Sequence, residues 1–431
     1  MVVRDPVHGD IEIAPLTAAV LDLGAVQRLR GVKQLGTAHL VYPGCVHTRF
    51  DHSLGTAHMA RRLTEALRRD GTAIPADLEA LIVVAALLHD VTHVPFGHTL
   101  EDERRLFPRH DKGARLERLL AGELGAALAR LSVLREVRAL LGADGDAGVT
   151  AAGLPCFARE IVASTVDADL LDYLARDAYF AGLGLRYDER VLRSFGVADD
   201  RLVLRLARDG MERPDARSEV VALLRMRYVL TERVYYHHTK VVAGAMISKA
   251  VERALDTGML SEDHLLEVDD GTLLDRLQAM GDPAGAALAA RVRRRDLLKR
   301  AWVVSARGTT VEERQKFVAW LHDDRAARAA AEAEIARAAG LAPGELVLHC
   351  PERTLMKEAS ARVIGAGGPG RLNDAGAEGL GEIRALEERY AALWRLHVFA
   401  PREAAERAVG AATEFFGRPS ERHPHAAAAT S

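Results

Sequence analysis

Histidine and aspartate side chains gather around one strongly apolar segment of this chain. His89 and Asp90 follow the apolar run Leu81–Leu88, and His52 lies upstream in the segment HTRFDHSLG. An unpaired charge at the end of a buried helix is costly, so metal coordination or a hydrogen-bond network must compensate it. Imidazole and carboxylate groups together suit Zn, Fe, Mn or Ni. The pattern therefore indicates a divalent transition-metal site, with a metal-free buried polar network as the alternative.

A further carboxylate for this site is available in the segment TVDADLLDYLARD. Asp169, Tyr173 and Asp177 follow one another at intervals of four residues, which places them on one face of a helix. Asp169 is therefore the candidate for the fourth ligand. The alternative for Tyr173 is an ordinary core aromatic.

Two more histidines, His93 and His98, follow the His-Asp pair in the segment HDVTHVPFGH. Imidazole titrates close to neutrality, so either is a candidate general acid, with a structural role in the turn as the alternative. His47 is expected to be structural. The dipeptide His322–Asp323 is expected to be exposed to solvent because it follows the surface-like stretch KFVAWL.

The composition is that of an ordinary globular protein. The chain has 431 residues, 48% hydrophobic and 28% charged, with a formal net charge of −3. No global basic excess indicates nucleic acid as the main partner, and the basic run Arg291–Arg300 is expected to be a solvated helix face. Three widely spaced cysteines fit a reducing compartment, and no apolar run approaches the ~20 residues that span a bilayer. We expect a cytoplasmic protein without a membrane segment.

Hydrophobic periodicity predicts a mainly α fold in two unequal parts. Residues 1–258 are expected to form a helical core with one small β-hairpin, residues 259–420 a smaller α+β region suited to oligomerisation, and residues 421–431 a flexible tail. The principal helices are predicted at Ser53–Arg69, Asp77–His89, Cys156–Ser164, Ala168–Phe180, Ser218–Leu255, Gly271–Ala301 and Thr310–Gly340. Strands are predicted at 345–350 and 393–400, and a flexible loop at Gly365–Gly370.

Five motifs, in the order DPVHGDIEI, QRLRGVKQLG, HTRFDHSLG, LLHDVTHVPFGH and VDADLLDYLARDAYFAG, resemble the HD-domain phosphohydrolases. The most similar members are the deoxynucleoside triphosphate triphosphohydrolases, which include a mammalian enzyme with SAM and HD domains. The resemblance covers about residues 3–245, and its five spaced motifs make it specific. We expect no SAM domain before the matching segment. The resemblance implies an HD-domain helical core.

The resemblance also implies a role for individual residues. It implies that the metal ligands are His52, His89, Asp90 and Asp169, the four residues already selected. The implied catalytic residues on the phosphate side are His93, His98, His110 and Glu101, the last of which stands where the family often has Asp. The implied substrate contacts are Gln34 and Asp177 at the sugar 3′-hydroxyl, Tyr173 beneath the sugar, Arg49 and Arg227 at the phosphates, and Tyr235 nearby. Leu170 stands where the mammalian enzyme has a phosphate-binding Lys.

The function implied by the resemblance is hydrolysis of (deoxy)nucleoside triphosphates to a nucleoside and inorganic triphosphate. Hydroxide generated at the metal would attack the α-phosphorus. A Mg²⁺ ion is expected to arrive with the substrate phosphates, and the protein is expected to be a homo-oligomer. Two alternatives remain: an HD-type nucleotidase or phosphodiesterase acting on nucleoside monophosphates or phosphodiesters, and a non-catalytic nucleotide-sensing assembly.

Overall fold

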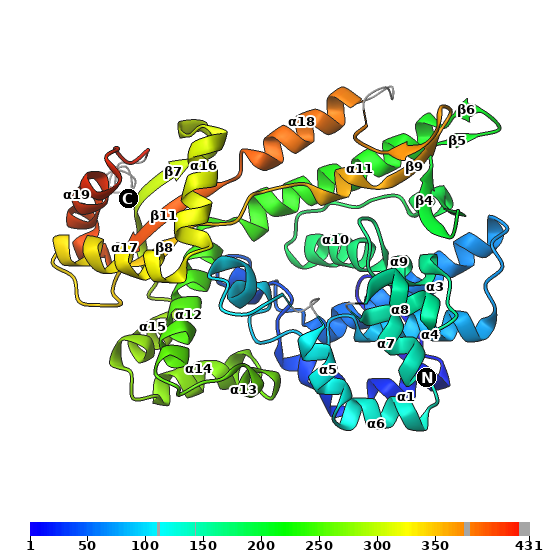
Figure 1. Cartoon of the computed structure of the whole chain (residues 1–431), viewed down its shortest axis with the longest axis horizontal. Coiled ribbons are helices and arrows are strands. Elements are labelled where there is room, and N and C mark those ends of the chain that lie inside the picture. Colours follow the sequence, from blue (N-terminus) through cyan, green and yellow to red (C-terminus); the bar gives the residue numbers. More distant parts are fainter. Residues whose placement is uncertain (110–112, 143, 375–379, 422–431) are drawn as a thin grey trace.

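The computed structural model describes residues 1–109, 113–142, 144–374 and 380–421. Most of these residues are helical, and the strands form small sheets (Figure 1). The mainly α fold class predicted from the sequence is confirmed. No helix among the described residues is long and apolar enough to cross a membrane.

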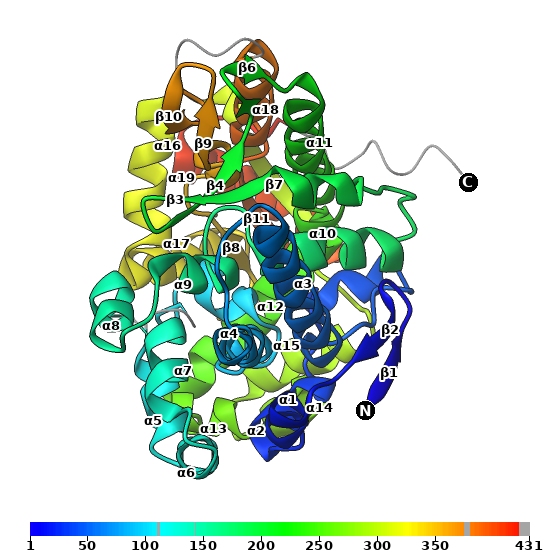
Figure 2. The ribbon, with the colours of Figure 1, turned by 90° about the vertical axis from the view of Figure 1, so that its right-hand side faces the viewer.

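Three helices form the centre of the N-terminal part: α3 (Arg49–Arg69), α4 (Ala76–Leu88) and α10 (Ala168–Phe180). Helix α3 packs against both of the others, and Figure 2 shows it beside α4 near the middle of the molecule. It begins earlier than the predicted Ser53, because Thr48 and Asp51 form a reciprocal capping box that satisfies two backbone donors.

Shorter elements surround these three helices. The hairpin β1 (Val2–Asp5) and β2 (Gly9–Glu12) contacts α3, while α1, α7 and α9 pack against α4. The buried apolar side chains of α4, such as Leu87 and Leu88, are fully enclosed by this shell. The remaining short helices are α1 (Pro15–Leu21), α2 (Gly24–Gln27), α5 (Ala114–Leu120), α6 (Glu123–Arg130), α7 (Leu134–Leu141), α8 (Gly145–Ala151) and α9 (Cys156–Val162).

The long helix predicted from Ser218 to Leu255 is interrupted. The structure has α11 (Pro214–Leu230), a π-helical turn at Thr231–Tyr235, and α12 (His238–Asp256). Wide turns of this kind are rare and are often found at functional sites. Apolar periodicity continues across the break, which explains why the sequence pattern did not reveal it.

The C-terminal part contains an antiparallel sheet with strand order β7 (Lys299–Ser305), β11 (Arg395–Ala400) and β8 (Val347–His349). Strands β8 and β11 lie in the two predicted segments, whereas β7 begins inside a segment predicted as helix. The helices of this part are α13 (Glu262–Leu266), α14 (Asp270–Ala279), α15 (Pro283–Arg293), α16 (Val311–Phe317), α17 (Arg325–Ala338) and α19 (Ala405–Phe416).

His322 also departs from its prediction. Its side chain is buried, and Nδ1 lies 2.9 Å from the carbonyl oxygen of Cys350. The exposure expected for this histidine is therefore wrong, because a π-helical turn at Val318–His322 directs it into the C-terminal core.

A second sheet crosses the boundary predicted near residue 258. Its strand order is β10 (Gly368–Arg371), β9 (Arg362–Gly365), β4 (Arg201–Arg205) and β3 (Phe195–Ala198). Strand β9 pairs in parallel with β4, and α18 (Leu380–Ala391) packs along α11. The segment Gly365–Gly370 was predicted as a loop, but only residues 366–367 form the turn of the β9–β10 hairpin, and the rest of the segment belongs to the two paired strands. A two-residue pair, β5 (Ala207–Arg208) and β6 (Met211–Glu212), completes the strands.

Candidate functional site

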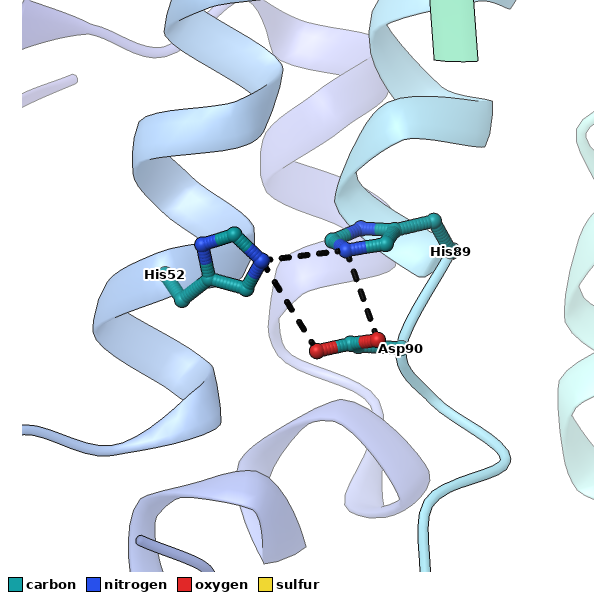
Figure 3. Close-up of side chains that lie close together, drawn as sticks. All are labelled: His52, His89 and Asp90. Carbon is teal, nitrogen blue, oxygen red and sulfur yellow. Dashed lines mark hydrogen bonds and ion pairs between the residues drawn. The ribbon is translucent and has the colours of Figure 1, made fainter. Parts of the chain in front are cut away.

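The four predicted metal ligands converge at the junction of α3, α4 and α10. The Nε2 atoms of His52 and His89 lie 3.2 Å apart, and Asp90 Oδ1 is 3.4 Å from His89 Nε2 (Figure 3). Asp169 Oδ1 is 2.9 Å from His52 Nε2 and 3.7 Å from His89 Nε2. Two imidazoles and two carboxylates thus present donor atoms to one small volume.

The orientation of the two imidazoles favours a cation between them. His89 Nδ1 lies 2.7 Å from the carbonyl oxygen of Ala86, and His52 Nδ1 lies 2.7 Å from Asp172 Oδ2. These acceptors hold a proton on each Nδ1, so both Nε2 lone pairs point toward the same place. Burial alone would lower the pKa of His52, but Asp169 and Asp172 raise it to about 10. The donor set therefore fits a divalent transition metal, which would replace a proton held between these groups.

Asp90 is held in its ionised form by its neighbours. Its Oδ2 accepts a charge-assisted hydrogen bond from Arg49 Nη1, and its Oδ1 lies 3.1 Å from His93 Nε2. Burial would raise the pKa of Asp90, but Arg49, His89 and His93 hold it well below its ordinary value. A carboxylate that is deprotonated in this way is ready to act as a metal ligand.

Sequence reasoning missed the group that orients His52. Asp172 Oδ2 lies 2.7 Å from His52 Nδ1, and Asp172 Oδ1 lies 2.6 Å from His8 Nε2. Arg176 donates two hydrogen bonds to the same carboxylate, each at 2.9 Å. Arg176 in turn donates to Asp5 at 2.8 Å. A side chain at Gly55 would collide with Asp172, so this glycine leaves room for the network. The i,i+4 spacing of Asp172 and Arg176 was a visible signal of a pair on this helix face.

Asp172→Asn is expected to weaken metal binding by about 10–100-fold, the usual cost of removing an outer partner of a ligand histidine. The asparagine side chain has one acceptor oxygen, whereas the carboxylate has two. It therefore cannot accept hydrogen bonds from both histidines and from Arg176. Competition titration with a chelating dye measures the affinity. Asp146→Asn, in an exposed ion pair with Arg201, is the matched control. Equal affinities for the two variants would contradict the orienting role.

A cavity of about 740 Å³ opens beside the four candidate ligands. Asp177 lines this cavity, and both of its carboxylate oxygens have a partner. Tyr235 OH donates to Oδ2 at 2.6 Å, and His47 Nε2 lies 2.9 Å from Oδ1. His47 was expected to be structural, and the structure gives it a definite place, since it fixes the orientation of Asp177. Gln34 also lines the cavity, and its Oε1 has no hydrogen-bond partner in the described part of the chain.

Arg227 and two tyrosines form another wall of the cavity. The Arg227 guanidinium lies 5.2 Å from the ring centroids of both Tyr173 and Tyr235, a cation–π arrangement that fixes its position. Its Nε donates to Glu358 Oε1 at 3.2 Å. Glu358 belongs to the C-terminal part, so that part contributes directly to the cavity. Tyr173 and Arg227 thus both line the cavity beside the candidate metal ligands.

The candidate catalytic residues begin beside Asp90, whose Oδ1 lies 3.1 Å from His93 Nε2. The rings of His93 and His98 meet edge to face at 4.8 Å between centroids. His98 Nδ1 lies 3.5 Å from both Glu101 Oε2 and Asp102 Oδ2, and Glu101 is also ion-paired with Arg115. Glu101 is thus a buried carboxylate that lies between His98 and Arg115. His110 lies outside the described residues.

Two family models match this chain. The HD domain matches residues 49–177, and the HD-associated region matches residues 188–426, more than half of the chain. The chain therefore belongs to the HD-domain phosphohydrolase superfamily, as its motifs predicted.

Individual relatives are similar over part of their length. An uncharacterized protein of Methanocaldococcus jannaschii is 31% identical over 306 residues, which are 69% of this chain and 58% of that protein. The deoxynucleoside triphosphate triphosphohydrolase SAMHD1 of Gallus gallus is 30% identical over 287 residues, which are 59% of this chain and 45% of that enzyme. The chain thus spans about half the length of these relatives.

Solved structures share the fold. A phosphohydrolase from Bacteroides thetaiotaomicron superposes with a TM-score of 0.70, at 21% identity, over 93% of this chain and 100% of that one. A hypothetical protein from Aquifex aeolicus superposes with a TM-score of 0.71, also at 21% identity, over 96% and 99% of the two chains. This likeness shows that the α core and the C-terminal part form one recurring architecture.

Proposed function

We propose that this chain hydrolyses deoxynucleoside triphosphates to a nucleoside and inorganic triphosphate. The observation that carries the proposal is one cavity that is lined both by three of the candidate metal ligands, His89, Asp90 and Asp169, and by a polar set suited to a sugar. That set consists of Asp177, Tyr235 and Gln34. A relative of similar sequence is a deoxynucleoside triphosphate triphosphohydrolase, which supports the same assignment.

Each end of the cavity has a distinct task in this proposal. A divalent metal held by His52, His89, Asp90 and Asp169 would lower the pKa of bound water and polarise the α-phosphate. Asp177 accepts a hydrogen bond from the sugar 3′-hydroxyl, and the Tyr173 ring packs beneath the sugar. His98, whose side chain is 46% exposed, donates a proton to the departing 5′-oxygen.

The phosphate chain needs cations, and the cavity has several. Leu170 supplies no charge, but Arg109, Arg159, Arg227 and Lys357 line the same cavity. Arg49 lies against Asp90, where it can bridge the metal site and a phosphate oxygen. Positive charge from several elements thus takes the place of the family's lysine, and it favours a polyphosphate over a monophosphate.

The experiment is incubation of the purified protein with Mn²⁺ and a panel of deoxynucleoside triphosphates, nucleoside triphosphates and nucleoside monophosphates, with products resolved by chromatography. Inorganic triphosphate and free deoxynucleoside are the expected products. Orthophosphate released from monophosphates would overturn the proposal in favour of a nucleotidase. No turnover with Mn²⁺, Fe²⁺, Zn²⁺, Ni²⁺ or Mg²⁺ would overturn it in favour of a nucleotide-sensing protein.

A further inference from the structure

A carboxylate from the C-terminal part reaches the wall of the cavity. Glu358 lies in the 3₁₀ turn Lys357–Ser360, and its Oε1 accepts a hydrogen bond from Arg227 Nε at 3.2 Å. Both side chains line the cavity, and the Arg227 side chain is 24% exposed and that of Glu358 12%. The ion pair therefore joins the C-terminal part to α11 at a place where water and salt screen it only in part.

The backbone that carries Glu358 is fixed by packing. Met356, Ala359 and Ala361 are buried, and they belong to the same apolar core as Leu174 of α10. Directly after Ala361, strand β9 begins and pairs in parallel with β4. The carboxylate is thus presented by a segment that is anchored on both sides, and a rigid support is what the precise positioning of a second side chain requires.

Glu358 uses only one of the hydrogen-bond donors of Arg227. A guanidinium carries five N–H donors, one on Nε and four on the two Nη atoms. The Nε donor is taken by Glu358, and neither Nη atom donates a hydrogen bond within the described part of the chain. Tyr173 and Tyr235 each place a ring centroid 5.2 Å from the guanidinium carbon. The Nη donors are therefore the part of Arg227 that remains for a ligand.

The remaining donors of Arg227 match a phosphate group. Parallel N–H donors of one guanidinium bind two phosphate oxygens together, and such charge-assisted pairs are strong and directional. Direction matters, because a small misplacement of a positioning cation is costly to the reaction. Burial would lower the pKa of Arg227, but Tyr173, Tyr390 and Glu358 hold it well above its ordinary value. Arg227 thus keeps its full charge in the cavity.

We propose that Glu358 is a positioning residue, which orients Arg227 to bind a phosphate group of the substrate. The carboxylate fixes Nε, the two tyrosine rings restrict the guanidinium, and the Nη donors bind the phosphate. This inference rests on the proposed function for the identity of the ligand, and it gives the C-terminal part a task in substrate binding. The reach of the acceptor carries the effect, because a negative charge beside a phosphate would by itself oppose binding.

The test compares two variants that separate reach from charge, by calorimetric titration of the full chain with inorganic triphosphate. Glu358→Gln keeps the length and an acceptor oxygen without the charge, so its affinity is expected to stay within about threefold of the wild type. Glu358→Asp keeps the charge but is one methylene shorter. It is expected to bind about tenfold more weakly, as for the loss of one hydrogen bond to a charged group. Glu382→Asp, in an exposed ion pair with Arg225 of α11, is the matched control and should bind like the wild type.

A second measurement asks whether Glu358 acts through Arg227. In the Arg227→Ala background, Glu358→Asp is expected to have no further effect on triphosphate affinity, since the group that Glu358 positions is absent. An equal loss in both backgrounds would overturn the positioning role. The opposite order of the single variants, with weakened binding in Glu358→Gln and unchanged binding in Glu358→Asp, would overturn it as well.

The outcomes separate this inference from the proposed function, since triphosphate binding requires no turnover. In steady-state hydrolysis, Glu358→Asp is expected to raise KM with kcat nearly unchanged, the pattern of lost substrate binding. Weaker triphosphate binding by Glu358→Asp without hydrolysis of any nucleotide would support the positioning role and contradict the proposed function. Unchanged binding by Glu358→Asp, together with release of triphosphate by the wild type, would overturn the positioning role and leave the proposed function standing.

Discussion

His89→Ala protein is expected to purify without stoichiometric metal and to lose hydrolytic activity by about 10³-fold or more, because bound water would then keep a high pKa. The imidazole of His89 approaches both His52 and Asp169 and shares the site with Asp90. Removal of this imidazole leaves three candidate metal ligands and an empty space where the fourth ligand stood. Elemental analysis and a steady-state assay on the same sample measure the two effects together.

The matched control is His264→Ala, since His264 is exposed on α13, far in sequence from the site. This variant should retain both metal and activity. Full metal occupancy in His89→Ala would contradict the assignment of His89 as a metal ligand. Full occupancy with lost activity would instead assign His89 a role in turnover alone.

Arg104→Met is expected to destabilise the fold by about 3–5 kcal/mol, the usual cost of removing one partner from a buried ion pair. Arg104 is buried and donates to Glu252 at 2.6 Å and to Glu332 at 2.9 Å. It thereby connects the end of the π-helical turn Thr99–Glu103 to α12 and α17. Methionine is similar in length but donates no hydrogen bonds, so both carboxylates lose a charged partner and keep Lys249 as the cation that they share. Urea unfolding followed by circular dichroism measures the difference.

The adjacent residue supplies the control for this prediction. Arg105 is exposed and forms a surface ion pair with Asp323, so Arg105→Met should change stability by no more than about 1 kcal/mol. Similar unfolding midpoints for the two variants would contradict the view that the buried network joins the two parts of the chain.

The four candidate metal ligands, whose side chains the structure brings together, could be selected from the sequence because their signals are local or periodic. His89 and Asp90 end a buried helix, and Asp169 shares a helix face with Tyr173 and Asp177. The mainly α fold followed from the same apolar periodicity. These signals need no knowledge of which elements meet in space.

The features that the sequence did not predict depend on tertiary contacts. Asp172 meets His8 across 164 positions, and His47 meets Asp177 across 130. Glu358 reaches Arg227 only because β9 pairs with β4. A π-helical turn is a single wide turn inside an otherwise helical segment, so the helical periodicity of its flanks does not reveal it.

The most direct test of the proposed function is ³¹P NMR of the products formed from deoxyguanosine triphosphate in H₂¹⁸O. Attack at the α-phosphorus breaks the bond between that phosphorus and the 5′-oxygen. We therefore expect inorganic triphosphate that carries one ¹⁸O on a terminal phosphorus, together with unlabelled deoxyguanosine. Pyrophosphate, orthophosphate or unlabelled triphosphate as the main product would contradict hydrolysis at the α-phosphorus.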